Sequence, residues 1–326
     1  MVDQGSPVTA SHRLSFGTFP TPLEPMRRLA AELGLGPDDL WIKRDDLIGL
    51  GGGGNKIRKL ERTLAELVAG GSDLIVTSGA PQSNHARLTA AAGARLGIPV
   101  VLVLEGAAPD AETGNLLLDR MLGARIEWAG EVDGPGLEAA VQAQVDEAER
   151  AGRRPGVVPF GGSNATGARA YEDAGHELLS QAGPVDTVVV AVGSGGTMAG
   201  LVSALGPDVV LGVDCGAVPD ARERVHRLSH EVSGRTDTSA ADLRIRDDLV
   251  GDGYEVLSDT VRAALQTVAR TEGIILDPVY TGRAAAGLIR AVDEGHVAPG
   301  TRTVLLHSGG LPGLFGHPHA APWREM

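Results

Sequence analysis

Short apolar runs alternate with longer amphipathic runs along most of the chain. The strongest short run, residues 185–192, has four valines between residues 188 and 192 and polar breaks on either side, which is typical of a buried strand. Among the longer runs, Ile57, Leu60 and Leu64 recur at the spacing of one helix face, and Gly70 ends the run. Strands that alternate with helices in this way predict an α/β protein whose parallel sheets carry helices on both faces.

The same pattern places the individual elements. It predicts strands at residues 40–43, 74–77, 100–104, 126–128, 185–192, 209–213 and 303–307. It predicts helices at residues 26–33, 56–69, 86–96, 115–122, 137–151, 168–179, 198–205, 220–232, 259–272 and 283–294. Ligands of parallel sheets bind beyond the carboxyl ends of the strands. We therefore expect the functional residues in the turns that follow these strands.

Length and charge narrow the class of protein. The 326 residues suffice for two domains or one large α/β unit. The formal net charge of -13 is spread along the chain, which argues against nucleic acid as the main partner. No apolar run is long enough to cross a membrane, residues 1–13 lack the apolar core of a signal peptide, and the single cysteine, Cys215, suits a reducing compartment. We expect a cytoplasmic protein that acts on small molecules, with neither a membrane nor nucleic acid as partner.

Four consecutive glycines, Gly51 to Gly54, precede Asn55 and Lys56 at the start of a predicted helix. Without side chains, these glycines let backbone amides come close to a planar or anionic ligand. Lys56 could act there as a phosphate counterion or as a Schiff-base amine. A helix N-terminus and an apolar pocket both disfavour the ammonium form, so they favour the neutral nucleophile that imine chemistry needs. The alternative is an ordinary turn followed by a solvated lysine.

The turn after residues 185–192 joins the predicted strand directly to a helix. Its free amides and the helix dipole suit a phosphate, and glycines allow close approach. The turn consists of Gly193, Ser194, Gly195, Gly196 and Thr197. No lysine follows it as in a Walker loop, and its spacing departs from the dinucleotide pattern, so a monophosphate fits best. The alternative is a tight connection that binds nothing.

Ser83, Asn84 and His85 lie at the start of another predicted helix. Their amides could bind a substrate carboxylate, with the Ser83 hydroxyl in support. The alternative is a simple N-cap, and the sequence leaves the two open. His226 and His230 have the spacing of a two-histidine metal face but lack a third ligand, so we predict no metal site.

An amine, a carboxylate site and a monophosphate site at one sheet edge together indicate pyridoxal phosphate with an amino acid. The run GGNKIRKLE at residues 53–61 resembles the signature of the D-cysteine desulfhydrase and 1-aminocyclopropane-1-carboxylate deaminase family. Further matches are KRDD at 43–46, QSN at 82–84, DPVY at 277–280 with Gly282, and HSGG at 307–310. The matches follow in order from about residue 15 to residue 316.

The resemblance implies a pyridoxal-phosphate enzyme of fold type II, the tryptophan-synthase-β type. Two parallel-sheet α/β domains would then hold the cofactor in the cleft between them. We expect residues 57–167 to form a smaller inserted domain, and residues 1–56 and 168–326 to form the larger one. Homodimers are common for this fold, and by analogy we expect one here.

The resemblance also implies roles for single residues. Lys56 would bind the cofactor covalently and move the proton at the substrate Cα. Asn84 would bond the cofactor's ring hydroxyl, and residues 193–197 would bind its phosphate. Ser83 would lie beside the substrate carboxylate.

Tyr280 and Tyr254 would face the substrate, where a phenol can donate or accept a proton. For Tyr254 this role is less direct, because the glutamate and valine that follow it replace the family's usual glycine and leucine.

Two cofactor-binding positions separate the activities of the family. The cyclopropane deaminases carry a glutamate where this chain has Thr281 and a leucine where it has Ser308. A neutral hydroxyl leaves the pyridine ring a weaker electron sink, which suffices for a good leaving group but suits cyclopropane opening poorly. The resemblance thus implies α,β-elimination from a small β-substituted amino acid, D-cysteine first.

Other functions stay open at this point. L-cysteate and 1-aminocyclopropane-1-carboxylate are alternative substrates. Rivals of another class are a catalytically silent protein that binds pyridoxal phosphate or an amino acid, and a nucleotide-binding α/β protein that uses residues 193–197 for a diphosphate. The intact Lys56, Ser83 and Tyr280 argue against the silent protein, since a decayed enzyme would be free to lose its catalytic amine.

Overall fold

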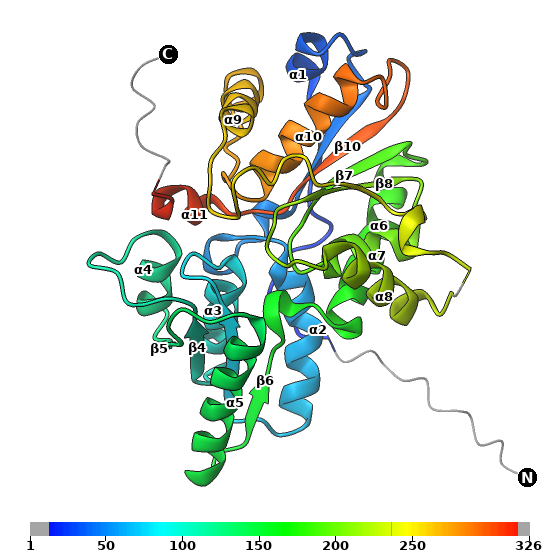
Figure 1. Ribbon diagram of the computed structural model, residues 1–326. Coiled ribbons are helices and arrows are strands. Elements are labelled where there is room, and N and C mark those ends of the chain that lie inside the picture. Colours follow the sequence, from blue (N-terminus) through cyan, green and yellow to red (C-terminus); the bar gives the residue numbers. More distant parts are fainter. Residues whose placement is uncertain (1–12, 236, 319–326) are drawn as a thin grey trace, which may run out of the picture.

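The computed structural model describes residues 13–235 and 237–318 (Figure 1). Residues 1–12, which carry most of the expectation about a signal peptide, lie outside the described residues. Within the described chain, the strands form a six-stranded sheet of order β1-β2-β10-β7-β8-β9 and a four-stranded sheet of order β5-β4-β3-β6. The α/β architecture expected from the apolar pattern is confirmed.

The larger sheet combines segments from both ends of the chain. Its strands are β1 (Leu23–Pro25), β2 (Leu40–Arg44), β7 (Thr187–Val192), β8 (Val210–Asp214), β9 (Arg244–Arg246) and β10 (Thr303–His307). The smaller sheet comes from one continuous stretch. Its strands are β3 (Leu74–Gly79), β4 (Val100–Leu104), β5 (Arg125–Trp128) and β6 (Pro155–Val157).

Among the described strand pairs, only β1 with β2 is antiparallel. The sequence pattern did not predict β1, β6 or β9. Each is three residues long and lies at a sheet edge. A strand this short shows no alternation of apolar and polar positions, so periodicity cannot detect it.

Each predicted helix is present, with its ends within about three residues of those expected. The helices around the larger sheet are α1 (Arg27–Glu32), α6 (Ala165–Ala182), α7 (Gly196–Leu205), α8 (Ala221–Ser233), α9 (Asp259–Glu272) and α10 (Thr281–Asp293). The remaining helices are α2 (Lys56–Ala69), α3 (Asn84–Leu96), α4 (Gly114–Met121), α5 (Gly134–Arg150) and α11 (Leu311–Gly316). Short 3-10 turns occur at Asp45–Leu47, Leu50–Gly52, Phe160–Gly162 and Ala240–Asp242.

Helices cover both faces of each sheet, which explains why the central strands are apolar throughout. Helices α1, α9 and α10 pack on one face of the larger sheet, and α6, α7 and α8 pack on the other (Figure 1). Every residue of β7 and β10 is accordingly buried. On the smaller sheet, α2 and α3 share a core on one face, and α5 covers the other.

A buried ionic cluster ties α2 to the larger sheet. Arg58 of α2 donates from Nε and Nη2 to the carboxylate of Asp45, each at 2.9 Å, and also pairs with Glu177 of α6 at 2.8 Å. Tyr171 of α6 donates to Asp45 Oδ2 at 2.5 Å, and Lys43 of β2 pairs with Glu177 at 2.5 Å. Helix α2 is therefore joined to the turn after β2 and to α6, while its apolar face packs in the core of the smaller sheet.

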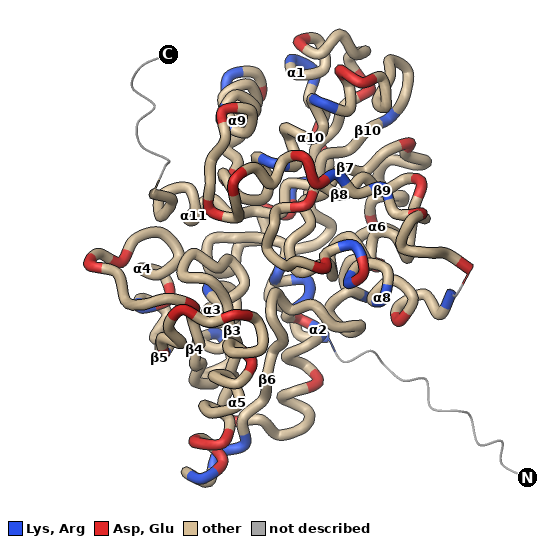
Figure 2. The backbone as a smooth tube through the Cα atoms, viewed as in Figure 1, with Lys and Arg blue, Asp and Glu red and all other residues tan. Residues whose placement is uncertain are grey.

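Charged residues of both signs are spread along the described chain (Figure 2). None of the described helices has the length and hydropathy of a membrane span. The described residues also contain no cluster of three or more potential metal ligands. His226 and His230 instead contact the backbone oxygen and the hydroxyl of Thr238, each at 2.9 Å.

Candidate active site

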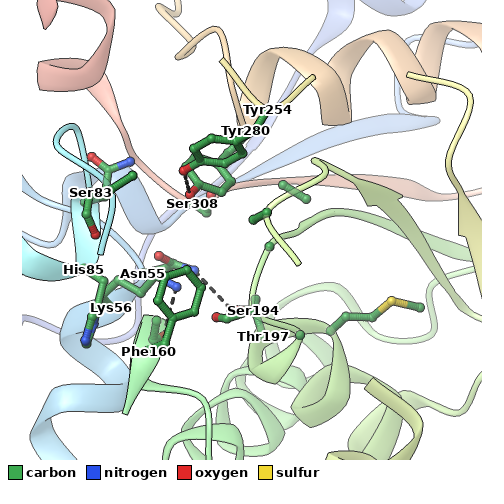
Figure 3. Close-up of a pocket in the computed structure, with 18 residues that line it drawn as sticks. Asn55, Lys56, Ser83, His85, Phe160, Ser194, Thr197, Tyr254, Tyr280 and Ser308 are labelled. Atoms are coloured by element: carbon green, nitrogen blue, oxygen red, sulfur yellow. Dashed lines mark hydrogen bonds between the residues drawn. The ribbon is translucent and has the colours of Figure 1, made fainter. Parts of the chain in front are cut away.

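A pocket lies where the carboxyl ends of strands from both sheets meet (Figure 3). It is lined by Asn55, Lys56, Ala80, Ser83, Asn84, His85, Phe160, Gly161, Ala191, Gly193, Ser194, Gly195, Thr197, Met198, Ala217, Tyr254, Tyr280 and Ser308. Its empty volume, with the open mouth included, is about 690 Å³. The position agrees with the rule that ligands of α/β sheets bind beyond the carboxyl ends of the strands.

The glycine loop before Lys56 needs each of its glycines. Gly51 to Gly54 have φ values of +57°, +84°, +81° and +134°, a region that side chains disfavour. A Cβ on Gly53 would lie 2.1 Å from the carbonyl oxygen of Asp46. The loop also lies against the turn after β10, where Asn55 N donates to Ser308 O at 2.9 Å. The glycines thus bring Lys56 and Ser308 to the same pocket.

Lys56 begins α2 and directs its amine into the pocket. Nζ donates to the carbonyl oxygen of Gly161 at 3.0 Å (Figure 3). Burial lowers the pKa of Lys56 to about 8, because the protein around Nζ replaces the water that would solvate an ammonium. A substantial fraction of neutral amine is therefore present near physiological pH.

The turn from Gly193 to Thr197 forms a cup at the N-terminus of α7. Gly195 has φ +89°, and the amide of Gly196 donates to the hydroxyl of Ser163 at 3.2 Å. The hydroxyls of Ser163 and Ser194 lie 2.8 Å apart. A Cβ on Gly196 would lie 2.6 Å from Ser163 Oγ, so only glycine fits at this position.

Lys59 is a second buried lysine, and it adjoins this cup. Nζ donates to Ser163 Oγ at 3.1 Å and would lie 3.0 Å from a Cβ on Gly196. Burial and then the nearby Lys56 lower the pKa of Lys59 well below its usual value. No carboxylate of the described residues pairs with Lys59. An amine in these surroundings is stabilised by an anion at the N-terminus of α7.

Sequence reasoning missed Lys59 and Ser163. A signal for Lys59 exists, since it follows Lys56 by three residues and so lies on the same face of α2. Ser163 comes from a loop about 100 residues further along, and no local pattern links it to Lys59. The third lysine of the chain, Lys43, lies in the ionic cluster described above, so all three lysines are inside the protein or line its pocket.

Asn55 connects the glycine loop to the cup. Its Nδ2 donates to Thr197 Oγ1 at 3.1 Å (Figure 3). Both side chains are buried. The contact joins the start of α2 to the start of α7.

Ser83 caps α3, because its Oγ accepts a hydrogen bond from Ala86 N at 3.1 Å. The capping alternative is therefore observed, while carboxylate binding by the same residues stays a prediction. Asn84 Oδ1 accepts from Asn115 Nδ2 of α4 at 3.1 Å. This contact fixes the Asn84 side chain at the pocket wall.

The His85 side chain lines the pocket and is held there by Thr77. Thr77 Oγ1 donates to Val158 O at 2.8 Å and lies 2.9 Å from His85 Nε2. Since the Thr77 proton is used, His85 Nε2 must carry its own proton and donate it. Burial and then the charges of Lys56 and Lys59 lower the pKa of His85 well below its usual value, so the ring is neutral.

Tyr254 and Tyr280 form the opposite wall (Figure 3). Their hydroxyls are hydrogen bonded to each other, and their rings meet edge to face with centroids 5.9 Å apart. Burial raises the pKa of each phenol above its usual value, so both stay protonated at neutral pH. The Tyr280 ring lies over Gly193, where a Cβ would be 3.1 Å from Cε1.

The two positions that separate the family's activities differ in their surroundings. Ser308 lines the pocket. Thr281 is buried and is absent from the described lining, and its hydroxyl donates to Asp277 Oδ1 at 2.6 Å. Cys215, which follows β8, is also buried beneath the site, and burial raises the pKa of its thiol.

Three comparisons place the chain among known proteins. Residues 14–309 match the family model described as pyridoxal-phosphate dependent enzyme. The D-cysteine desulfhydrase of Salmonella typhimurium is 39% identical over 327 residues, covering 96% of this chain and 98% of that protein. A solved structure of an ACC deaminase homologue superposes with a TM-score of 0.86 at 34% identity, covering 95% of each chain. Threonine deaminase isoform 2 from Solanum lycopersicum shares the fold, with a TM-score of 0.65 at 19% identity over 90% of this chain and 80% of that one.

Proposed function

Because the chain belongs to the pyridoxal-phosphate-dependent enzyme family, we propose that it converts D-cysteine and water to pyruvate, ammonia and hydrogen sulfide. The observation that carries this proposal is the convergence of Lys56, Ser83 and Tyr280 on one pocket. An amine, a hydroxyl beside helix amides and a protonated phenol are the groups that an α,β-elimination from an amino acid needs.

The chemistry of the pocket fits pyridoxal phosphate. Lys59 is buried without a carboxylate partner among the described residues, and it lies at the N-terminus of α7, where free amides favour an anion. We assign the phosphate to residues 193–197 with Lys59 and Ser163. Lys56 would hold the cofactor covalently.

The cofactor ring would contact two further residues. We assign its hydroxyl to Asn84 and its nitrogen to Ser308, both of which line the pocket. Thr281 is buried outside the described pocket lining, and its hydroxyl donates to Asp277, so its influence on the ring would be indirect.

When bound, pyridoxal phosphate withdraws electrons from the substrate Cα and so makes its proton removable. Lys56 Nζ, held by the Gly161 carbonyl, accepts that proton. The Ser83 hydroxyl and the first amides of α3, up to His85, bind the substrate carboxylate. Tyr280, kept protonated by its burial and paired with Tyr254, donates a proton to the departing sulfur.

Charge in the pocket favours cysteine over cysteate. Of the described residues that line the pocket and its outer extension, Lys56 is the single lysine and none is an arginine, while Glu255 lines the outer part. Burial and then the charges of Glu255 and Glu131 raise the pKa of nearby Glu105. A sulfonate on the substrate would therefore enter a region without a cation of its own and close to carboxylates.

Parallel substrate assays test the proposal. The purified holoenzyme is given D-cysteine, L-cysteate or 1-aminocyclopropane-1-carboxylate, and pyruvate, sulfite and 2-oxobutanoate are measured. We expect kcat/KM for D-cysteine to exceed that for L-cysteate at least about tenfold. Formation of 2-oxobutanoate without pyruvate would overturn the interpretation of Ser308 and Thr281. A visible absorbance band without turnover of any substrate would favour the silent binding protein instead.

The pKa of Lys56 predicts how cofactor uptake depends on pH. Burial lowers that pKa from 10.5 to about 8, and only the neutral amine is a nucleophile. The rate at which apoprotein takes up pyridoxal phosphate should rise about tenfold per pH unit below pH 8 and level off above it. Stopped-flow absorbance between pH 6 and 10 measures this rate. A rate that keeps rising to pH 10 would contradict the assigned environment of Lys56.

A Lys59→Gln variant should bind the cofactor more weakly. Loss of a buried, charge-assisted contact to the phosphate is expected to raise the dissociation constant of pyridoxal phosphate about 10- to 100-fold. Equilibrium titration of apoprotein measures it. Arg62→Gln is the control, because Arg62 is on the same helix but pairs with Asp173 outside the pocket. Equal affinity in the two variants would remove Lys59 from the phosphate site.

We propose residues 57–167 as the smaller domain, with residues 1–56 and 168–326 forming the larger one. All strands of the four-stranded sheet fall between residues 74 and 157, and those of the six-stranded sheet lie outside that range. This division supports a cofactor cleft between the two units.

We propose that the protein forms a homodimer through α4 and α11. These helices contact each other and expose large apolar side chains, with Met121 73% and Phe315 72% exposed. Leu117 and Leu311 extend the patch. A patch of this kind marks an interaction site more often than chance. Light scattering coupled to size-exclusion chromatography tests the mass, and Phe315→Glu should shift it toward the monomer.

We further propose a cytoplasmic location. The support is compositional: one cysteine in 326 residues suits a reducing compartment. Fractionation of the source cells tests this expectation.

A further inference from the structure

Asp277 accepts four hydrogen bonds from the turn that carries Tyr280. Its Oδ2 accepts from Val279 N at 3.0 Å and from Tyr280 N at 2.8 Å. Its Oδ1 accepts from Thr281 N at 2.8 Å and from Thr281 Oγ1 at 2.6 Å. Asp277 N in turn donates to Thr281 Oγ1 at 2.8 Å. The turn is therefore closed by one carboxylate and one hydroxyl, which we call the Asp277 clamp.

The clamp supplies hydrogen-bond acceptors for the first amides of α10, which have no side-chain cap from Tyr280. The Tyr280 side chain does not cap the helix, because its hydroxyl is directed to Tyr254 in the pocket. The first amides of α10 need an acceptor, and a carboxylate there is also favoured by the helix dipole. Asp277 is buried with Thr281, so water does not compete for these amides.

The same carboxylate packs against the turn that carries Ser308. Gly310 has φ +105°, and a Cβ on it would lie 2.7 Å from Asp277 Cγ. The neighbouring Gly309 is equally close to the glycine loop, since its Cβ would lie 2.7 Å from Gly54 Cα. Asp277 thus lies between the Tyr280 turn and the segments that place Ser308 and Lys56.

From this arrangement we propose that Asp277 is a positioning residue for Tyr280, with the Thr281 hydroxyl as the second part of the clamp. The inference rests on the proposed function, because it assigns Tyr280 the role of proton donor to the leaving group. Asp277 itself does not enter the chemistry, since both its oxygens are occupied by the turn. Thr281 accordingly acts on the phenol's position and does not contact the cofactor ring.

Three variants test the clamp. Asparagine at position 277 has one acceptor oxygen, so its amide nitrogen must face two donors. Thr281→Val loses the hydroxyl, and Thr281→Ser retains it. We expect Asp277→Asn and Thr281→Val to lower kcat about 10- to 100-fold with cofactor affinity unchanged, and Thr281→Ser to stay near wild type. Thr271→Val on α9 is the control for loss of a threonine hydroxyl outside the site.

A double-variant comparison separates positioning from general damage. If Asp277 acts through Tyr280, Asp277→Asn combined with Tyr280→Phe should be no slower than Tyr280→Phe alone. Multiplied losses in the double variant would overturn the proposal. A shift of the bound cofactor's absorbance maximum in Thr281→Val would also overturn it, because that shift indicates contact with the ring.

Hydrogen exchange provides a readout that needs no turnover. Mass spectrometry of the peptide spanning residues 276–284 should show at least about tenfold faster amide exchange in Asp277→Asn and Thr281→Val, and unchanged exchange in Thr281→Ser. Unchanged exchange in all three would overturn the clamp. If the wild type acts on no β-substituted amino acid, the proposed function fails while this exchange result still decides whether the clamp exists.

Discussion

Replacing Lys56 with alanine should abolish the visible absorbance of the bound cofactor and lower the turnover of D-cysteine on the order of 10³-fold or more. No other lysine amine takes the position of Lys56 Nζ in the pocket. Lys59 Nζ also reaches the Gly161 carbonyl, at 3.5 Å, but its shorter contact is to Ser163 Oγ at 3.1 Å, and Lys43 is bound in the ionic cluster by Glu177. The substrate Cα would then keep its proton, because neither a covalent link nor a base remains.

Absorbance spectra and a pyruvate assay measure this loss at saturating pyridoxal phosphate. Lys59→Gln is the matched control, since it removes a buried lysine from the same helix but should recover its turnover when the cofactor saturates. A Lys56→Ala variant that retains both the band and turnover would refute the central assignment. A variant that loses the band while keeping turnover would show that Lys56 binds the cofactor without serving as the base.

Asp45→Ala should destabilise the protein by about 3–5 kcal/mol, because it leaves a buried guanidinium short of its partner. The Asp45 carboxylate is buried and accepts from Arg58, Tyr171 and Thr21, with Thr21 Oγ1 at 2.8 Å. Glu177 still pairs with Arg58, but its charge is shared with Lys43. Since Arg58 is two residues after Lys56, we also expect weaker cofactor binding.

Urea unfolding followed by circular dichroism measures the change in stability. Asp237→Asn is the control, because Asp237 pairs with Arg235 on the surface and should contribute nothing measurable. Equal stability of the two variants would mean that other contacts or water compensate fully for the lost Asp45 carboxylate. Strong destabilisation with unchanged cofactor affinity would separate the cluster from the positioning of Lys56.

Local sequence signals predicted the structure correctly where a single segment determines its own conformation. The valines of β7 predicted a buried strand, and the glycines of residues 51–54 predicted a loop, which the structure shows with a positive φ at each glycine. Lys56 followed from its position at the end of that loop. The same reasoning failed for the pairing of Lys59 with Ser163, since a contact over about 100 residues depends on how two units pack.

The case of Thr281 shows a second limit. The resemblance to known enzymes implies that this residue binds the cofactor, and that role stays a prediction. The resemblance did not reveal that the Thr281 hydroxyl bonds to Asp277 four residues earlier. Short polar side chains often bond to nearby backbone or side chains in this way, and a motif does not reveal which partner is chosen. Ser308 has no such local partner, and it lines the pocket as expected.

The placement of the three lysines has a practical consequence for handling the protein. Lys43 and Lys59 are buried and Lys56 lines the pocket, so amine-directed reagents find no lysine on the outer surface. Attachment to a sensor surface by coupling to lysine side chains would then be confined to the Lys56 amine inside the pocket. Borohydride reduction of the holoenzyme would likewise fix the cofactor permanently to a single lysine, Lys56.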